Sequence, residues 1–437
     1  MRSPAPSNDT IGFLIRGSFA SLSTRVVGVA LSYVTAAILA RTLGASGYGI
    51  YSIALAWALI LVLPSRAGLD FVALRYAAFY IEHGERARLR ALVRFTGLAV
   101  VGLSVAMGTV LYALTINRLT SAPPELAPGM VLVILPVAIL GLVAAYLRNA
   151  RRIIASQFYE QILRPGLLIL ALAAAVLAGL RISASTAMIL TGMSALAAMA
   201  LGWFHAVRAM GGGRGRPDYG PWREWVALSV PIFFITVVQE LLNQLDIIML
   251  GYLDRPESAG LYSAAWRIAS LVTFGLVALT TVNGPLIAAA YARRDTAELG
   301  SIARTTARFG FGASLVLTVI LMVGGRTVLQ LFGPEFGRAY PALLILLIGG
   351  LINGFTGAVA YLLTMTGRQT KALGIFALAL LVSFALNLLL IPRLSIVGAA
   401  IASSSATAVW NLAMLIVVRR ELGIDASALA RARAAPH

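Results

Sequence analysis

The chain has 437 residues, of which 59% are hydrophobic and only 12% are charged, and its mean hydropathy is +0.87. Because soluble domains carry about 25% charged residues, this composition excludes an ordinary soluble protein and indicates a membrane protein. The formal net charge of +18 raises the possibility of nucleic-acid binding, but the order of the charges along the chain, described below, argues for a membrane instead.

Hydrophobic segments of about 20 residues recur along nearly the whole sequence, and this is the length that a helix needs to cross hydrocarbon. Since unpaired backbone groups are not tolerated in lipid, each segment is predicted to be a helix. The sequence therefore predicts an all-α polytopic membrane protein with about 12 transmembrane helices. The predicted ranges are 17–40, 48–71, 92–115, 127–147, 162–180, 186–208, 225–250, 259–283, 305–328, 340–366, 371–391 and 397–418.

The basic residues alternate between the predicted connections. Of the 35 lysines and arginines, 25 lie in every second connection starting from the N-terminus, seven lie in the connections between, and three lie inside predicted helices. Basic connections favour the cytoplasmic side of a membrane. The pattern predicts that both termini are cytoplasmic, and it supports the number of helices because one missed span would invert the alternation downstream.

The residues that bind metals or form disulfides are scarce. The chain has no cysteine, and its three histidines, His83, His205 and His437, are far apart in sequence. A disulfide framework and a thiolate metal site are excluded, and no metal site is expected. A membrane-embedded sugar polymerase usually carries a long external loop or an acid in the first one, and Arg41–Tyr48 (RTLGASGY) has neither. We expect no catalytic residues and no enzymatic activity.

A short phrase occurs twice. Leu43–Ser52 reads LGASGYGIYS, and Leu250–Ser263 reads LGYLDRPESAGLYS. Its glycines Gly44, Gly47 and Gly49 predict a turn that needs positive φ. Each copy precedes a helix, and the two helices are six spans apart, so the chain is predicted to form two parallel, pseudo-symmetric six-helix bundles, an arrangement that transporters use.

The repeat sets the predicted domain boundaries. Residues 1–209 are expected to form an N-terminal lobe and residues 225–437 a C-terminal lobe with a short cytoplasmic tail. Between them, MGGGRGRPDYGPWREW (Met210–Trp225) is rich in Gly, Pro and Arg. Such composition favours a flexible connection, so residues 210–224 are predicted to be a cytoplasmic linker.

Several motifs resemble one family. The pattern A-R-x-L-G-x-x-x-Y-G-x-Y-S-x-A after the first helix is similar to that of polysaccharide-biosynthesis and O-antigen-type oligosaccharide flippases, members of the multidrug/oligosaccharidyl-lipid/polysaccharide exporter superfamily. The other matching segments are FYEQILRPGLLIL (Phe158–Leu170), LLNQLDIIMLGYL (Leu241–Leu253) and LNLLLIPRLSIVGAAIASSSAT (Leu386–Thr407). Together they extend the resemblance over nearly the full chain.

The resemblance implies two lobes around a central cavity and a flippase of the bacterial cytoplasmic (inner) membrane. Such a protein moves an undecaprenyl-diphosphate-linked glycan from the cytoplasmic to the outer leaflet by alternating access. Membrane lipids, a polysaccharide polymerase and glycosyltransferases are the implied partners, and nucleic acid is not. No cofactor is expected, and the coupling ion would be H+ or Na+. The alternative is a cation-coupled multidrug or metabolite exporter of the same superfamily.

Charged residues inside the predicted spans give the candidate site. Each costs roughly 2.5–3.5 kcal/mol to insert into lipid, so these side chains must face a polar interior. On the seventh helix, Gln239, Asn243 and Asp246 share one face at 100° per residue, which indicates a helix with a wet side. The six intramembrane charges are Arg25, Arg66, Asp70, Glu240, Asp246 and Arg267.

Guanidinium groups stay charged and donate paired hydrogen bonds to phosphate oxygens. We therefore expect arginines to bind the diphosphate and amides to face the sugars: Arg25, Arg66, Arg267, Gln239 and Asn243. Glu240, Asp246 and Asp70 are the expected ion-coupling carboxylates, because a carboxylate in low dielectric can change its protonation. Simpler pairings remain open: Arg66 with Asp70 four residues on, Arg25 or Arg267 with Glu240 or Asp246, and Glu160 with Arg164.

Overall fold

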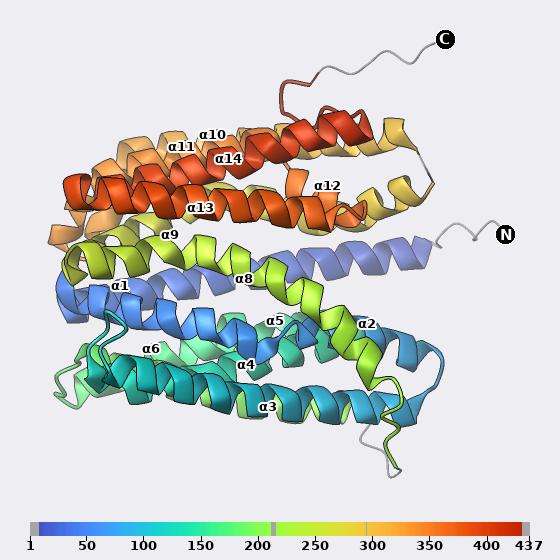
Figure 1. Ribbon diagram of the computed structural model, residues 1–437, viewed down its shortest axis with the longest axis horizontal. Helices are drawn as coiled ribbons and strands as arrows, with labels where there is room; N and C mark the ends of the chain where they lie inside the picture. The colour runs from blue at the N-terminus through green and yellow to red at the C-terminus, as the bar shows by residue number, and fades with distance from the viewer. Residues whose placement is uncertain (1–7, 211–215, 294, 431–437) are drawn as a thin grey trace. The chain divides into compact units, whose positions relative to one another are not determined.

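The computed structural model describes residues 8–210, 216–293 and 295–430, with side chains from Ser23 onward except at positions 281, 282 and 285. These residues are helical nearly throughout and contain no β-strand (Figure 1). Eleven helices in the described part of the chain are long and apolar enough to cross a membrane. The prediction of an all-α, multi-pass membrane protein is confirmed.

Helix α1 (Asn8–Arg66) explains why the described residues form eleven candidate membrane helices where the sequence predicts twelve spans. Its apolar part, Ser23–Arg66, is 44 residues long, which is about twice the length that one crossing needs. Gly44 interrupts the helix with φ 66° and ψ 175°, and α1 bends back on itself (Figure 1). Two predicted spans are therefore joined in this one element.

Two predicted spans are broken in the structure. Span 48–71 ends at Arg66, because Ala67 and Gly68 have φ of 47° and 72°, and α2 (Leu69–Glu82) follows. Span 340–366 is divided by Gly357, with φ 67°, into α11 (Tyr340–Thr356) and α12 (Val359–Met365). Average hydropathy over a 20-residue span does not register these breaks, because each depends on the backbone conformation of one or two residues.

The remaining helices follow the predicted order. They are α3 (Arg86–Ile116), α4 (Ala127–Asn149), α5 (Ile153–Phe158), α6 (Arg164–Leu177), α7 (Ala184–Ala209), α8 (Trp222–Leu253), α9 (Pro256–Ala292), α10 (Thr296–Gln330), α13 (Gln369–Leu394) and α14 (Ile396–Leu422). A π-helical segment, η2 (Tyr159–Leu163), joins α5 to α6, and short 3-10 helices, η1 (Pro124–Leu126) and η3 (Pro334–Ala339), precede α4 and α11.

The chain forms two compact units. The first comprises Met1–Leu43 and Ala54–Val237, and the second comprises Gly44–Ile53 and Val238–His437. The predicted lobes, 1–209 and 225–437, differ from this division at Gly44–Ile53, which belongs to the second unit, and at the start of α8, which belongs to the first. Trp225 is fully buried in the first unit and donates a hydrogen bond from Nε1 to the Tyr80 hydroxyl at 3.1 Å.

The predicted linker 210–224 is partly structured. Residues 211–215 lie outside the described residues, but the part after them is held on α3. Arg88 pairs with Asp218 at 3.2 Å, and the Asp218 backbone N–H donates to the Ala87 carbonyl at 3.2 Å. The backbone N–H of Gly220 and the Arg88 guanidinium lower the pKa of the Asp218 carboxyl below its usual value. The second half of the predicted linker is thus hydrogen-bonded to α3, and its flexibility stays a prediction.

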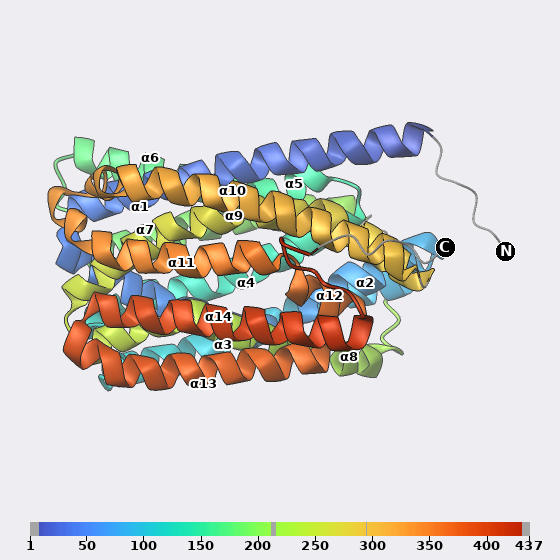
Figure 2. The same cartoon turned by 90° about the horizontal axis from the view of Figure 1, so that it is seen from above.

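Each unit packs around apolar helices. In the first unit α4 is the centre, since 83% of its membrane window is buried, and α3 and α7 flank it. In the second unit α14 packs against α11 and α13, and α13 and α14 lie side by side in both views (Figures 1 and 2). The segment after α14 folds back on the second unit, where Arg308 donates to the Ala430 carbonyl at 2.7 Å.

The two copies of the repeated phrase pack against each other within the second unit. A Cβ added to Gly49 would lie 1.6 Å from the Pro256 carbonyl oxygen, and one added to Gly260 would lie 2.2 Å from the Ala45 carbonyl oxygen. Gly44 has the positive φ that the turn prediction required, but Gly47 and Gly49 are helical without it, so the prediction is wrong for these two. Gly49 is needed for another reason, because the two backbones touch there. The phrase is repeated at a backbone-to-backbone contact.

We expect Gly49→Ala to destabilise the protein by about 1–3 kcal/mol or more, because the methyl group has no room without separating the helices. The measurement is the melting temperature of the purified protein in detergent, which should fall by several degrees. Gly102→Ala on α3 is the matched control, since nothing lies within 4 Å of its added Cβ. An unchanged melting temperature for Gly49→Ala would contradict the close contact.

Candidate functional site

Arg66 sits in a cluster of charges in the first unit. Its guanidinium lies 4.0 Å from Asp70 and 3.9 Å from Glu160, and it donates to the Val137 carbonyl at 2.5 Å. It packs over Gly141, where an added Cβ would lie 2.8 Å from the guanidinium carbon. The pairing of Arg66 with Asp70 is confirmed, although a helix break lies between them.

Glu160 is the member of this cluster that the sequence did not identify. It was expected to pair with Arg164, but its carboxylate faces Arg66 instead. Glu160 belongs to the π-helical segment η2, which widens the helix by one residue, and such segments occur frequently at functional sites. Gln161 of the same segment approaches α1, with its Cβ 2.7 Å from where a Cβ on Gly28 would lie.

Arg25 is half-buried on α1 of the first unit, one turn before Gly28. The positive charge of Arg148, at the end of α4, is close enough to interact with it. Two guanidinium groups that repel each other electrostatically favour binding of an anion near them, because the anion offsets their repulsion. The sequence assigned Arg148 only to a connection, and its electrostatic interaction with Arg25 was not predicted.

On α8 the polar residues of the predicted wet face differ in how far they are buried. Gln239 and Asn243 are exposed, Glu240 is half-buried and accepts a hydrogen bond from Gln244 at 2.8 Å, and Asp246 is only 1% exposed. Periodicity placed all of them on one side of the helix. It could not show that neighbouring helices cover the side at Asp246 and leave it open at Asn243.

Asp246 is held in a polar network inside the second unit. Its carboxylate accepts from the Tyr262 hydroxyl at 2.6 Å and from Asn387 Nδ2 at 2.7 Å. Asn387 Nδ2 also lies 3.3 Å from the Ser383 hydroxyl. Among the described residues no donor reaches the buried Oδ1 of Asn387. The network therefore contains one spare acceptor next to a buried carboxylate.

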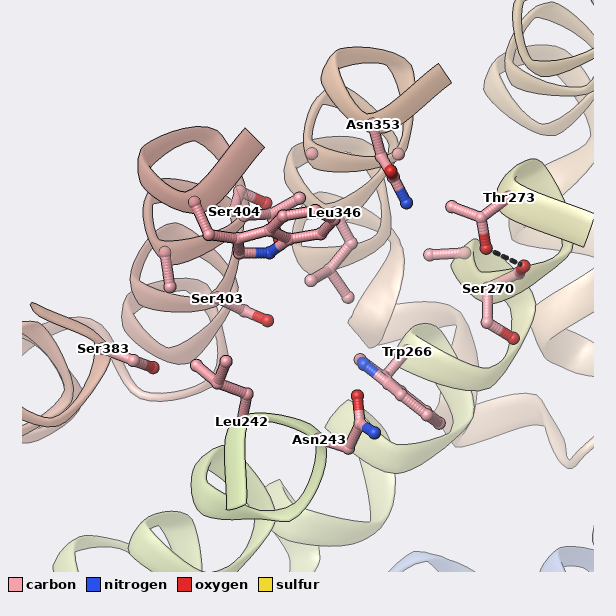
Figure 3. Close-up of a pocket in the computed structure, with 16 residues that line it drawn as sticks. Leu242, Asn243, Trp266, Ser270, Thr273, Leu346, Asn353, Ser383, Ser403 and Ser404 are labelled. Atoms are coloured by element: carbon pink, nitrogen blue, oxygen red, sulfur yellow. Dashed lines mark hydrogen bonds between the residues drawn. The ribbon is translucent and has the colours of Figure 1, made fainter. Parts of the chain in front are cut away.

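A cavity of about 200 Å³ lies in the second unit, between α8, α9, α11, α13 and α14. Figure 3 shows Asn243, Trp266, Asn353 and Ser403 directed toward it. Ser383 lines it and also lies 3.3 Å from Asn387 Nδ2, which donates to Asp246, so the cavity and the buried network share a side chain. The polar and aromatic lining residues are Asn243, Trp266, Ser270, Thr273, Asn353, Ser383, Ser403, Ser404, Thr407 and Trp410.

The structure groups the predicted site residues only in part. Asn243 lines the cavity, whereas Gln239 and Arg267 are not among the described residues that line it. Arg267 is half-buried on α9 next to Trp266. Arg25, Arg66 and Asp70 belong to the first unit, and Gln239, Glu240, Asn243, Asp246 and Arg267 belong to the second. The convergence of the three arginines on one anion stays a prediction.

The comparison with known proteins identifies a family. A family described as "Polysaccharide biosynthesis protein" matches residues 14–291, which is more than half of the chain. A second family, MatE, matches residues 231–389. A curated relative, "Probable flippase AglR" of Haloferax volcanii, is 30% identical over 166 residues. That match covers 36% of this chain and 34% of the relative, so the chain spans about a third of the relative's length.

Solved structures share the fold at low identity. An inward-facing multidrug resistance MATE family transporter has a TM-score of 0.71 at 14% identity, covering 93% of this chain and 98% of that one. The lipid II flippase MurJ, in an inward closed conformation, has a TM-score of 0.73 at 14% identity, covering 93% and 87%. A MOP superfamily transporter from Pyrococcus furiosus has a TM-score of 0.70 at 14% identity, covering 94% and 95%.

These likenesses establish the fold, and the family match covers both the repeated phrase and the start of the second unit. The resemblance seen in the motifs is confirmed. The chain belongs to the polysaccharide biosynthesis protein family.

Proposed function

We propose that this protein is a flippase that moves an undecaprenyl-diphosphate-linked oligosaccharide from the cytoplasmic to the outer leaflet by alternating access. The observation that carries the proposal is the cavity of the second unit, which combines two indole rings with amide and hydroxyl groups. The name of the Haloferax relative, a probable flippase, supports the same reading.

The cavity suits a sugar. A sugar ring presents hydroxyl groups around its edge and apolar C–H faces, and the lining offers partners for both: amides and hydroxyls for the edge, and Trp266 and Trp410 for the faces. Its volume of about 200 Å³ is below the roughly 300–1,000 Å³ of pockets for drug-sized ligands. We therefore infer that it holds one sugar ring and not the whole glycan.

The same lining disfavours the alternative of cationic drug export. None of the described residues that line the cavity is acidic. A cation taken out of water needs a carboxylate or a comparable partner, since an unpaired buried charge is costly. Asp246 lies behind the cavity, and both of its oxygens already accept hydrogen bonds.

We further propose Arg25 in the first unit and Arg267 in the second as phosphate ligands, with the positive charge of Arg148 acting on Arg25. Arg66 is a weaker candidate for a phosphate ligand, because two carboxylates within 4.0 Å already offset its charge. Its ion pairs with Asp70 and Glu160 indicate that it also stabilises the first unit.

For ion coupling we propose Asp246 ahead of Glu240 and Asp70. Its buried carboxylate and the unpartnered Asn387 Oδ1 supply oxygen atoms of the kind that Na+ prefers, and a proton on the carboxylate is the other way to remove the buried charge. Because Ser383 belongs both to this network, through Asn387, and to the cavity wall, binding in one can alter the other.

The function is tested first in cells. Deleting the gene should cause polyprenyl-diphosphate-linked glycan to accumulate on the cytoplasmic side, while efflux of a cationic dye such as ethidium stays unchanged. Trp266→Ala and Asn243→Ala should each restore flipping only in part, with about a tenfold loss for the lost hydrogen bond of Asn243. Phe384→Ala, an exposed aromatic residue next to Ser383, should restore it fully. Loss of dye efflux without glycan accumulation would contradict the proposal.

Removing either proposed phosphate ligand should slow flipping. Arg25→Gln and Arg267→Gln are each expected to lower the rate at least about tenfold, because hydrogen bonds to charged groups contribute about 1.5–3 kcal/mol. The measurement is the rate of glycan flipping in proteoliposomes, and Arg181→Gln, at an exposed arginine between α6 and α7, is the control. A wild-type rate in Arg25→Gln or Arg267→Gln would rule that arginine out as a ligand.

The coupling proposal predicts a change in ion dependence. Flipping by the wild type should depend on Na+ or on pH, and Asp246→Asn should remove that dependence because the neutral amide neither titrates nor neutralises a cation. Titrations of the flipping rate against Na+ at fixed pH, and against pH at fixed Na+, separate the two ions. If Glu240→Gln or Asp70→Asn loses the dependence and Asp246→Asn keeps it, Asp246 is the wrong carboxylate.

A further inference from the structure

The first unit contains a second hollow that the proposed function does not use. It is a groove of about 460 Å³ between α3 and α7, and its lining includes Leu135 and Ile139 of α4. The lining is apolar apart from Arg94, and Gly97 and Trp203 face each other across it, since a Cβ on Gly97 would lie 3.1 Å from the indole ring. It shares no lining residue with the cavity of the second unit.

The groove opens outward along its length. Leu98 is 71% exposed and Val101 is 41% exposed, and both line it. In a membrane helix such exposure means contact with lipid. From Val93 to Val101 the α3 side of the groove runs for about 12 Å at 1.5 Å per residue, which accommodates part of one acyl chain.

One end of the groove is positively charged. Arg94 lines it and is exposed, and it joins none of the ion pairs that the described residues form. Arg208 follows the lining residue Val207 at the end of α7. Arg88, on the same helix as Arg94, is by contrast neutralised by Glu85 and Asp218. The groove thus joins an apolar trough to an uncompensated guanidinium.

We propose that this groove binds one anionic phospholipid, with an acyl chain along Leu98, Val101 and Trp203 and the phosphate on Arg94. Basic pockets between transmembrane helices on the cytoplasmic side bind acidic lipid headgroups, and the arginine-rich end of α3 is predicted to face that side. The lipid lies against α4, the most buried helix of the first unit, and therefore stabilises that unit.

The fluorescence of Trp203, which lines the groove, reports lipid binding there. The full-length protein is placed in phosphatidylcholine bilayers that contain increasing mole fractions of brominated phosphatidylglycerol or of brominated phosphatidylcholine, whose bromine atoms quench indole fluorescence on contact. The chain has six tryptophans, so the signal of Trp203 is the difference between the wild type and Trp203→Phe.

Half-quenching of Trp203 should occur at a mole fraction about fivefold lower for phosphatidylglycerol than for phosphatidylcholine, the effect expected of one arginine near the membrane surface. Arg94→Gln should abolish the difference. Arg75→Gln, which removes the same charge from an exposed position on α2 outside the groove, should preserve it.

Equal quenching by the two lipids would overturn the proposal, and so would a preference that survives Arg94→Gln. Displacement of the brominated phosphatidylglycerol by undecaprenyl diphosphate at a lower mole fraction would also overturn it, because the groove would then belong to the isoprenoid lipid. None of these outcomes depends on flipping activity, so the lipid site and the flippase proposal fail separately.

Discussion

A charged or polar side chain inside hydrocarbon must have a partner, and this requirement explains the internal organisation of both units. Arg66 is satisfied by Asp70, Glu160 and a backbone carbonyl. Asp246 is satisfied by Tyr262 and Asn387. Each solution joins helices that are distant in sequence, so the polar groups determine which helices lie together as much as the apolar surfaces do.

The same requirement separates two kinds of polar surface in the second unit. Around Asp246 the groups are buried and almost fully hydrogen-bonded, whereas the adjoining cavity is lined by uncharged amides, hydroxyls and two indoles. A carboxylate placed behind a neutral cavity suits ion binding next to sugar binding. Ser383, which lines the cavity and contacts Asn387 of the network, connects the two sites physically.

Hydropathy predicted the membrane helices well, because membrane insertion constrains every span separately. The sequence patterns did not predict helix breaks inside spans, the burial of single residues or ion pairs between distant helices, because these depend on local backbone conformation and on the helices packed nearby. The positive φ of Gly357 inside an apolar span has no hydropathy signal. The buried carboxylate of Asp246, close to exposed Asn243, is held by Tyr262 of α9 and Asn387 of α13, and the pairing of Arg66 with Glu160 depends on a π-helical segment. The tryptophans of the cavity look like ordinary apolar positions in sequence.

The central claim is that the cavity of the second unit recognises sugar. The most direct test is the affinity of the purified protein in nanodiscs for undecaprenyl diphosphate with and without its attached oligosaccharide, both extracted from the host. The account predicts at least about tenfold tighter binding of the glycan-bearing lipid, equivalent to about 1.4 kcal/mol, and a loss of this difference in Trp266→Ala. Equal affinities in the wild type would contradict it.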